Sequence, residues 1–317
     1  MIQGKVIKST GSWYLVQKED MEIIPCRIIG KFRLNGMKLT NPVAVGDNVE
    51  FEMEGSEEEN KGIIKKILSR ENYVVRQSPR KKHALHLLAS NVDQAIVIVT
   101  VIQPMLKPAF IDRFLLMTEP HNIPTHIVFN KVDLYDEKEF GMYAAMEEIY
   151  TSIGYQVHLI SAEKNAGMQE MLTILKDKIT LISGQSGVGK STFINRIIND
   201  KVIKTQDISE YSGKGQHTTT FAEMFPLEIG GFVIDTPGIK TLSFNNLEPE
   251  DVVHNFREFF DKSKDCKFGN CKHRDEPKCA VKEALETGEI SELRYFNYIQ
   301  ILEEIEDQNY WERHTDL

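Results

Sequence analysis

The sequence predicts a multidomain α/β protein with an N-terminal β-barrel, a central doubly wound α/β domain and a C-terminal helical region. Residues 1–72 contain five short β-rich pieces separated by turn residues. From Asn91 onward, apolar strands alternate with helical segments, which is the pattern of a parallel sheet with helices on both faces. From about residue 246 the chain is mainly helical and carries a group of cysteines. We expect domains at 1–72, 73–245 and 246–317.

The N-terminal strands are expected at residues 4–7, 13–17, 23–28, 48–53 and 62–68. Five short strands indicate a small barrel, with the oligonucleotide-binding (OB) fold as the leading interpretation and an SH3-like barrel as the alternative. Trp13, Tyr14 and Phe32 are candidate stacking platforms for RNA bases, although such aromatic residues more often belong to a core.

The composition of the chain limits its partners and its location. The net charge of −9 argues against a protein that coats nucleic acid through bulk charge. A local basic segment without acids runs from Arg76 to His86 and is either a solvated loop or a contact surface. No apolar run reaches the ~18 residues of a membrane span, and the N-terminus lacks the apolar core of a signal peptide. We expect a cytoplasmic monomer without membrane association.

A glycine-rich segment between an expected strand at residues 179–183 and an expected helix at residues 190–198 matches the pattern G-x-x-x-x-G-K-[ST]. Its glycines let backbone N–H groups surround phosphates, and the helix N-terminus adds partial positive charge. Lys190 is expected to reach the β- and γ-phosphates, and Ser191 to ligate Mg²⁺. The candidate nucleotide-binding residues of this phosphate loop are Gly184, Gln185, Ser186, Gly187, Val188, Gly189, Lys190, Ser191 and Thr192.

A second motif follows an expected strand at residues 125–129 and predicts which nucleotide base the protein binds. It consists of Asn130, Lys131, Val132 and Asp133. The Asp133 carboxylate can accept two hydrogen bonds from N1–H and the 2-amino group of guanine, a pair that adenine does not offer. Asn130 can contact the base edge and connect neighbouring loops, while the stem of Lys131 can lie across the purine. Ser161 and Ala162 follow the next expected strand and match the loop that supports guanine O6 in GTPases.

Two further segments are expected to sense the γ-phosphate. Asp235, at the end of an apolar segment, is suited to hold Mg²⁺ through water, and the Gly238 amide to bind the γ-phosphate. The polar, glycine-containing segment at residues 213–220 has the composition of a switch loop. There Thr219 is expected to contact Mg²⁺ in the GTP state, with Thr218 and Thr220 as alternatives.

The residue that would position the attacking water for GTP hydrolysis does not stand at its usual place after Gly238. Many GTPases have a glutamine where this sequence has Ile239, and an aliphatic side chain cannot orient water. His217 is our candidate for that role, and a surface histidine without a role is the alternative. The candidate catalytic residues are His217, Lys190 and Thr219.

A zinc site is predicted by the cysteines. The pattern Cys266-x4-Cys271-x-His273-x5-Cys279 supplies three thiolates and an imidazole, which suit a closed, tetrahedral, structural Zn²⁺ site. Unrelated cysteines in a loop are the alternative interpretation. Cys26 stands apart and is expected to be a buried thiol.

The motifs occur in rotated order, with the base motif upstream of the phosphate loop. The same sheet is retained if the usual termini are joined and the chain is opened after the second switch. Together with the barrel and the cysteine cluster, this order resembles the RsgA family of ribosome small-subunit-dependent GTPases over essentially the whole chain. The cysteine pattern matches that family residue for residue. Potassium-activated relatives have an asparagine where this chain has Gly187, so the sequence gives no basis for predicting a potassium requirement.

The resemblance implies an enzyme that hydrolyses GTP to GDP in late assembly of the small ribosomal subunit, binds that subunit and its rRNA, and is stimulated by it. A nucleotide-gated RNA-binding scaffold with incidental hydrolysis stays open because of Ile239, whereas Asp133 disfavours an ATP-dependent kinase. The expected cofactors are GTP or GDP, Mg²⁺ and one structural Zn²⁺. The rotated order also makes the second switch continuous with the C-terminal region, which would let it transmit loss of the γ-phosphate.

Overall fold

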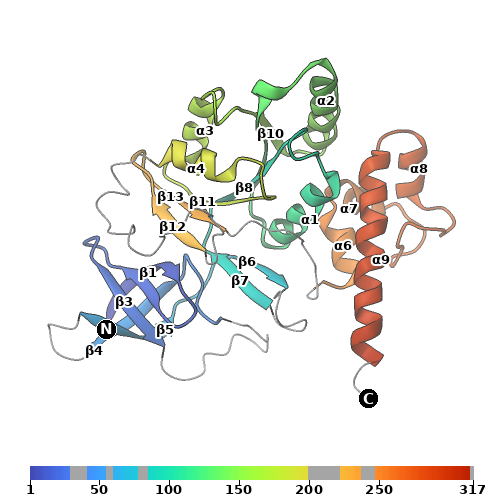
Figure 1. The fold of residues 1–317 in the computed structure, drawn as a ribbon. Coiled ribbons are helices and arrows are strands. Elements are labelled where there is room, and N and C mark those ends of the chain that lie inside the picture. The colour runs from blue at the N-terminus through green and yellow to red at the C-terminus, as the bar shows by residue number, and fades with distance from the viewer. Residues whose placement is uncertain (29–40, 55–59, 78–84, 199–221, 237–246, 315–317) are drawn as a thin grey trace.

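The computed structural model describes residues 1–28, 41–54, 60–77, 85–198, 222–236 and 247–314. Figure 1 shows the three parts that the sequence predicts: a barrel, a central sheet flanked by helices, and a helical C-terminal region. Within these residues, no helix is long and apolar enough to cross a membrane.

The N-terminal barrel is formed by β1 (Ile2–Ser9), β2 (Tyr14–Gln17), β3 (Ile23–Ile28), β4 (Asn48–Glu54) and β5 (Lys61–Ile67). The strand order β1-β2-β3-β5-β4 closes through a β4–β1 pairing, and β3 and β5 are parallel. This order with one parallel pair is that of the OB fold, so the leading interpretation is confirmed over the SH3-like alternative. Alternate residues point inward, and Tyr14 is 1% exposed in the barrel core, whereas Trp13 is 38% exposed. Phe32 lies outside the described residues.

The central sheet contains β8 (Gln94–Val99), β9 (Thr125–Phe129), β10 (Gln156–Leu159), β11 (Ile179–Gly184), β12 (Glu223–Pro226) and β13 (Phe232–Asp235). Its order is β10-β9-β8-β11-β13-β12, and every pair is parallel except β12–β13. The β8 strand is buried on both faces, as its continuous apolar run predicts.

Helices cover both faces of this sheet (Figure 1). On one face α1 (Pro108–Thr118) and α2 (Glu137–Ser152) pack in a core that includes Val97 and Val99. On the other face α3 (Met168–Leu175) and α4 (Lys190–Ile197) pack in a core that includes Ile96 and Ile98. Successive side chains of β8 therefore point alternately into two cores, one on each face of the sheet. This arrangement confirms the doubly wound domain.

The barrel is joined to the central sheet by contacts that the sequence does not reveal. The edge strand β12 pairs with β1, and Lys8 forms an ion pair with Glu223 at 2.9 Å. Asp47, which is fully buried, accepts hydrogen bonds from Arg70 Nε and Nη2, both at 2.6 Å, and from Ser90 Oγ at 2.6 Å. These contacts fix the barrel against the start of the central domain.

The basic segment is not simply a solvated loop. Its ends form a separate hairpin of β6 (Tyr73–Gln77) and β7 (Leu85–Ser90), which place Arg76 opposite His86. The basic residues between them, at positions 80–83, lie outside the described residues.

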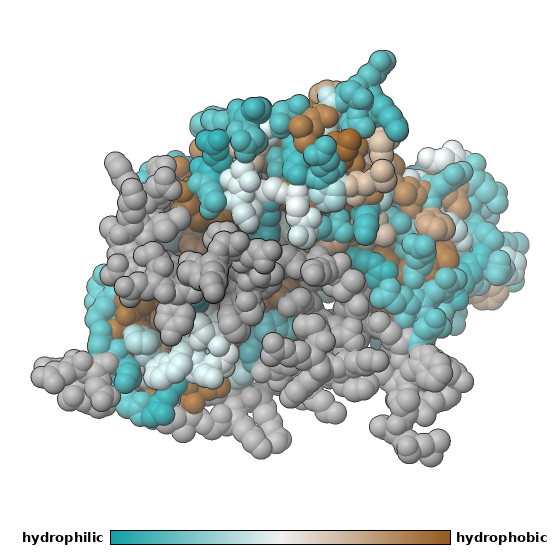
Figure 2. Space-filling model, in the orientation of Figure 1, coloured by the Kyte–Doolittle hydropathy of each residue, from teal (hydrophilic) through white to brown (hydrophobic). Residues whose placement is uncertain are grey.

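The C-terminal region contains α6 (Pro249–Asn255), α7 (Arg257–Ser263), α8 (Ala280–Glu286) and the long α9 (Glu292–His314). These helices pack beside α1, and Phe256, Phe259 and Tyr298 share one apolar core with Phe114 of α1. The helical region is thus built onto one face of the central domain. Figure 2 shows hydrophilic residues over much of the described part of one face of the molecule, with apolar residues in small patches.

Candidate functional site

The predicted phosphate loop connects β11 to α4 at the carboxyl edge of the sheet. Gly187 and Gly189 have φ angles of +86° and +90°, which L side chains rarely adopt. A Cβ on Gly184 would lie 2.6 Å from the Ile98 carbonyl oxygen, and one on Gly189 would lie 2.3 Å from Asn130 Nδ2. Three glycines of the motif are therefore required by backbone conformation or close packing.

The base motif lies beside this loop because β9 and β11 flank β8 in a parallel sheet. The Asn130 side chain donates from Nδ2 to the Val188 carbonyl at 2.9 Å and accepts from the Ala162 amide at 2.9 Å. Asn130 therefore connects three loops, as expected. Lys131 donates to the Gly187 carbonyl at 2.7 Å and to the Gln103 carbonyl, which draws its alkyl stem across the site.

Asp133 is oriented by the loop after β10. Its Oδ1 accepts a hydrogen bond from Ser161 Oγ. Ser161 Oγ in turn accepts a hydrogen bond from the Lys164 amide at 3.0 Å. Arg196 of α4 donates to the Ala162 carbonyl at 3.2 Å, which fastens this loop to the helix that follows the phosphate loop. The structure thus brings the base motif, the Ser161–Ala162 pair and the phosphate loop together.

Lys190 and Asp235 form an ion pair at the same edge. Asp235 ends β13, the neighbour of β11, and its Oδ1 accepts from Lys190 Nζ. The same ammonium group donates to the Thr236 carbonyl at 2.5 Å, and Lys190 is 8% exposed. The lysine and the carboxylate that we expect around the phosphates and Mg²⁺ are therefore within reach of one another. Ser191 and Thr192 open α4 beside them.

Several expected site residues lie outside the described residues. They are His217, Thr218, Thr219, Thr220, Gly238 and Ile239. The expected switch segment at residues 213–220 lies wholly outside the described residues, and the second expected segment is described only as far as residue 236, so the roles of these residues stay predictions.

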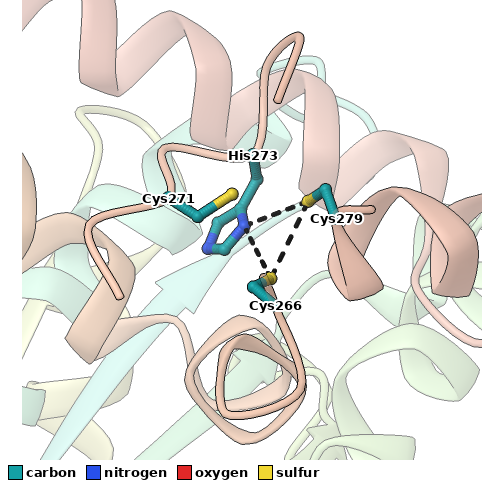
Figure 3. Close-up of side chains that lie close together, drawn as sticks. All are labelled: Cys266, Cys271, His273 and Cys279. Carbon is teal, nitrogen blue, oxygen red and sulfur yellow. Dashed lines mark hydrogen bonds between the residues drawn. The ribbon is translucent and has the colours of Figure 1, made fainter. Parts of the chain in front are cut away.

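The four predicted metal ligands converge in the loop between α7 and α8 (Figure 3). His273 Nδ1 lies 3.7 Å from Cys266 Sγ and 3.3 Å from Cys279 Sγ, and the two sulfurs are 4.0 Å apart. A tetrahedral Zn²⁺ with bonds of ~2.0–2.3 Å separates its ligand atoms by roughly 3.5–3.8 Å. The donor set and the spacing therefore fit a zinc ion. None of the four cysteines of the chain is in a disulfide.

The surroundings of this cluster favour a structural role. Burial lowers the pKa of His273, which keeps the imidazole neutral as a ligand must be, and burial raises the pKa of Cys271 to about 12, so a cation must displace its proton. Tyr295 of α9 donates to the His273 carbonyl at 2.7 Å, and Tyr298 donates to the Lys272 carbonyl at 3.0 Å. These bonds fix the ligand loop on α9. Cys26 is buried in the barrel core, as expected.

Two contributors to the nucleotide site have no motif of their own. The loop after β8 supplies the Gln103 carbonyl that Lys131 contacts, and Tyr135 reaches into the same region with its hydroxyl. The position of Gln103 was accessible to sequence reasoning, because carboxyl ends of adjacent parallel strands meet at one edge of a sheet. The hydroxyl contact of Tyr135 was not.

Comparison with known proteins agrees with this arrangement. Residues 67–245 match the RsgA GTPase family, and residues 3–64 match the RsgA N-terminal domain. A small ribosomal subunit biogenesis GTPase RsgA from Phocaeicola vulgatus is 47% identical over 98% of this chain and 99% of its own length. The relative of the same name from Christiangramia forsetii is 47% identical over 96% of this chain and 97% of its own.

Two crystal structures resemble the whole chain. YjeQ from Thermotoga maritima is 38% identical with a TM-score of 0.73, over 96% of this chain and 98% of that one. YloQ, described as a circularly permuted GTPase, is 32% identical with a TM-score of 0.71, over 97% of this chain and 96% of that one. The motif order, the sheet order and these matches agree, and the chain belongs to the RsgA family of circularly permuted GTPases.

Proposed function

We propose that this GTPase acts as a timer in late assembly of the small ribosomal subunit and that the subunit stimulates its hydrolysis of GTP to GDP and phosphate. The observation that carries the proposal is the assembly of the base motif and the phosphate loop on one sheet edge, between a barrel and a Cys/His region, in a chain that matches relatives named for this process. A role on ribosomal particles places the chain in the cytoplasm, and we expect it to act as a monomer.

In this proposal, different residues at the sheet edge bind different parts of the nucleotide. Asp133, oriented by Ser161, accepts hydrogen bonds from the guanine edge, and Lys131 covers the base. The backbone of the phosphate loop and Lys190 hold the phosphates. Ser191 would ligate Mg²⁺ and Asp235 would hold it through water, and the ion would neutralise charge that develops on the phosphates. For this, Lys190 must exchange part of its contact with Asp235 for the β- and γ-phosphates.

The switch residues complete the proposed site. Thr219 would contact Mg²⁺ and the Gly238 amide the γ-phosphate, and His217 would orient the attacking water. His217→Ala is expected to lower subunit-stimulated turnover while leaving the Kd for GTP unchanged. Wild-type turnover of this variant would remove His217 from the mechanism.

Zinc in the cluster of Cys266, Cys271, His273 and Cys279 would stabilise the region that faces RNA. The ligand loop exposes Lys267 and Lys278, which suit phosphate contacts. In the barrel, Trp13 is exposed and could still stack on an RNA base, whereas Tyr14 is buried and could not. We propose domain limits of 1–72, 73–245 and 246–317, with an rRNA-contacting surface on the first and last.

Co-sedimentation with purified small subunits tests the partner. The chain should pellet with small subunits in the presence of a non-hydrolysable GTP analogue, pellet less with GDP, and fail to pellet with large subunits. Equal pelleting with both subunits would contradict the proposed partner. The scaffold alternative, kept open by Ile239, predicts GTP-dependent binding to the small subunit without any increase in turnover.

A further inference from the structure

Tyr135 places its hydroxyl between two neighbouring strands of the central sheet, at the point where they separate. The regular β8–β9 ladder ends with the Asn130 amide, which donates to the Val99 carbonyl at 2.9 Å. In a parallel ladder, the next bond would run from the Val101 amide to the Asn130 carbonyl. Instead, the Val101 amide donates to the Tyr135 hydroxyl at 3.1 Å, and this hydroxyl donates to the Asn130 carbonyl at 3.0 Å.

The two segments separated by this hydroxyl both contribute to the nucleotide site. On the β9 side, Asn130 connects the phosphate loop with the loop at Ala162. On the β8 side, Val101 begins the loop whose Gln103 carbonyl accepts a hydrogen bond from Lys131. A Cβ added to Gly187 would lie 3.7 Å from Pro104 of that loop, so it also borders the phosphate loop. The distance between these segments therefore affects the position of Lys131, which we propose covers the base.

The surroundings of the Tyr135 side chain favour this position of its hydroxyl. Its ring is half-buried and meets Phe140 edge-on, with ring centroids 5.8 Å apart. The Thr100 hydroxyl donates to the Pro104 carbonyl at 2.8 Å and the Leu106 amide donates to the Val101 carbonyl at 3.1 Å, so the loop after β8 is held together by its own hydrogen bonds. Burial also raises the pKa of Tyr135 to about 12, and the hydroxyl keeps its proton at neutral pH.

We propose that Tyr135 is a positioning residue for the guanine nucleotide, which acts by holding the ends of β8 and β9 apart. Without the hydroxyl, the Val101 amide and the Asn130 carbonyl lose their partner, and the ladder can close by one further bond. Closure moves the Gln103 loop and Lys131 toward each other and narrows the space for the base. This inference rests on the GTPase site alone and is independent of the proposed ribosomal role.

The test compares Tyr135→Phe with Tyr143→Phe. Both changes remove one tyrosine hydroxyl, but the hydroxyl of Tyr143 donates to Glu147 on the same helix, at 2.7 Å, and not to the backbone at the ends of β8 and β9. The full-length chain, freed of nucleotide, is titrated with fluorescent GDP and with a fluorescent non-hydrolysable GTP analogue well below its melting temperature. For Tyr135→Phe, both Kd values should rise about tenfold, because the new bond between the Val101 amide and the Asn130 carbonyl, about one net hydrogen bond, must break before the base can enter. Tyr143→Phe should bind like the wild type.

Steady-state kinetics and melting temperature separate positioning from stability. In assays of the chain alone, Tyr135→Phe should raise KM for GTP and change kcat by less than about twofold, as expected when an interaction common to ground and transition states is lost. A lower melting temperature with wild-type Kd values would assign the hydroxyl to fold stability alone and overturn the proposal. Wild-type Kd values with an unchanged melting temperature would overturn it as well.

Discussion

Arg294 on α9 donates a hydrogen bond to Asp112 on α1, and these side chains are 2% and 0% exposed. The guanidinium also forms a two-pronged pair with Glu258 on α7, at 2.7 and 3.0 Å. Asp112 accepts further bonds from Tyr150 and Asn297, at 2.8 and 2.5 Å. One buried cation thus holds three helices, and α1 begins where the Gln103 loop of the nucleotide site ends.

Replacement of Arg294 by methionine should destabilise the chain strongly. Two carboxylates would remain buried without their cation, which costs about 3–5 kcal/mol of unfolding free energy. The control is Arg113→Met, because Arg113 pairs with Glu304 at a half-exposed site on the same α1–α9 contact, where a pair contributes ~0–1 kcal/mol. Urea denaturation measures both. Equal losses for the two variants would contradict this account of the buried network.

Asp133→Asn should change the base preference. The amide cannot accept both hydrogen bonds that guanine donates, so affinity for GTP should fall about a hundredfold. The same amide can donate to the carbonyl that xanthine carries in place of the 2-amino group, so affinity for xanthosine triphosphate should rise. Asp136→Asn is the matched control, because Asp136 caps α2 and asparagine preserves that cap. Competition binding measures the preference, and unchanged GTP affinity in Asp133→Asn would exclude this role.

Cys279→Ser should release the zinc ion. Loss of one of four ligands opens a closed site, and the ligand loop should then exchange its amide hydrogens faster. Metal content by mass spectrometry and hydrogen exchange over residues 264–279 measure the two effects. Cys26→Ala, in the barrel core, should retain zinc at the wild-type level. Wild-type zinc content in Cys279→Ser would show that the cluster is not the site.

Acid should weaken the fold through His126. Its Nδ1 lies 3.0 Å from His158 Nε2, and His158 contacts Glu170 at 2.8 Å. Burial, with a smaller contribution from His158, lowers the pKa of His126 to about 4. Because an unfolded histidine titrates near 6.5, the unfolded chain binds the proton first. Stability is therefore complete above about pH 6.5 and is lost as pH falls toward 4.

His126→Gln should reduce this pH dependence between pH 6.5 and 4. The slope removed is at most about 1.4 kcal/mol per pH unit, the contribution of one proton. Denaturation curves of the wild type and of His126→Gln over this pH range measure the difference in slope. If the slopes of the wild type and His126→Gln agree, His126 is not the titrating group.

Sequence reasoning succeeded where the information is local. The phosphate loop, the base motif and the strands around them follow from short patterns, and the expected strand at residues 125–129 has the bounds of β9. The Cys/His pattern also identified residues that come together. These elements depend on backbone conformation and residue type over a few positions.

Contacts between distant segments were not predictable in this way. The sequence of α9 does not indicate that its apolar residues share a core with those of α1. Nor does the sequence around Asp47 indicate that Arg70 and Ser90 are its hydrogen-bond partners. The β6–β7 hairpin was missed because its charged residues suggested a loop. The ion pair of Lys190 with Asp235 depends on adjacency of β11 and β13, which only the sheet order supplies.

Turnover of GTP with and without purified small ribosomal subunits tests whether the small subunit activates this GTPase. Phosphate release is measured under single-turnover and steady-state conditions, with large subunits as the control particle and with Lys190→Ala, which lacks the lysine that we propose binds the phosphates. We expect slow hydrolysis by the chain alone, strong stimulation by small subunits and none by large subunits, with Lys190→Ala inactive throughout. Equal rates with and without small subunits, at concentrations where they bind the chain, would contradict activation by the small subunit.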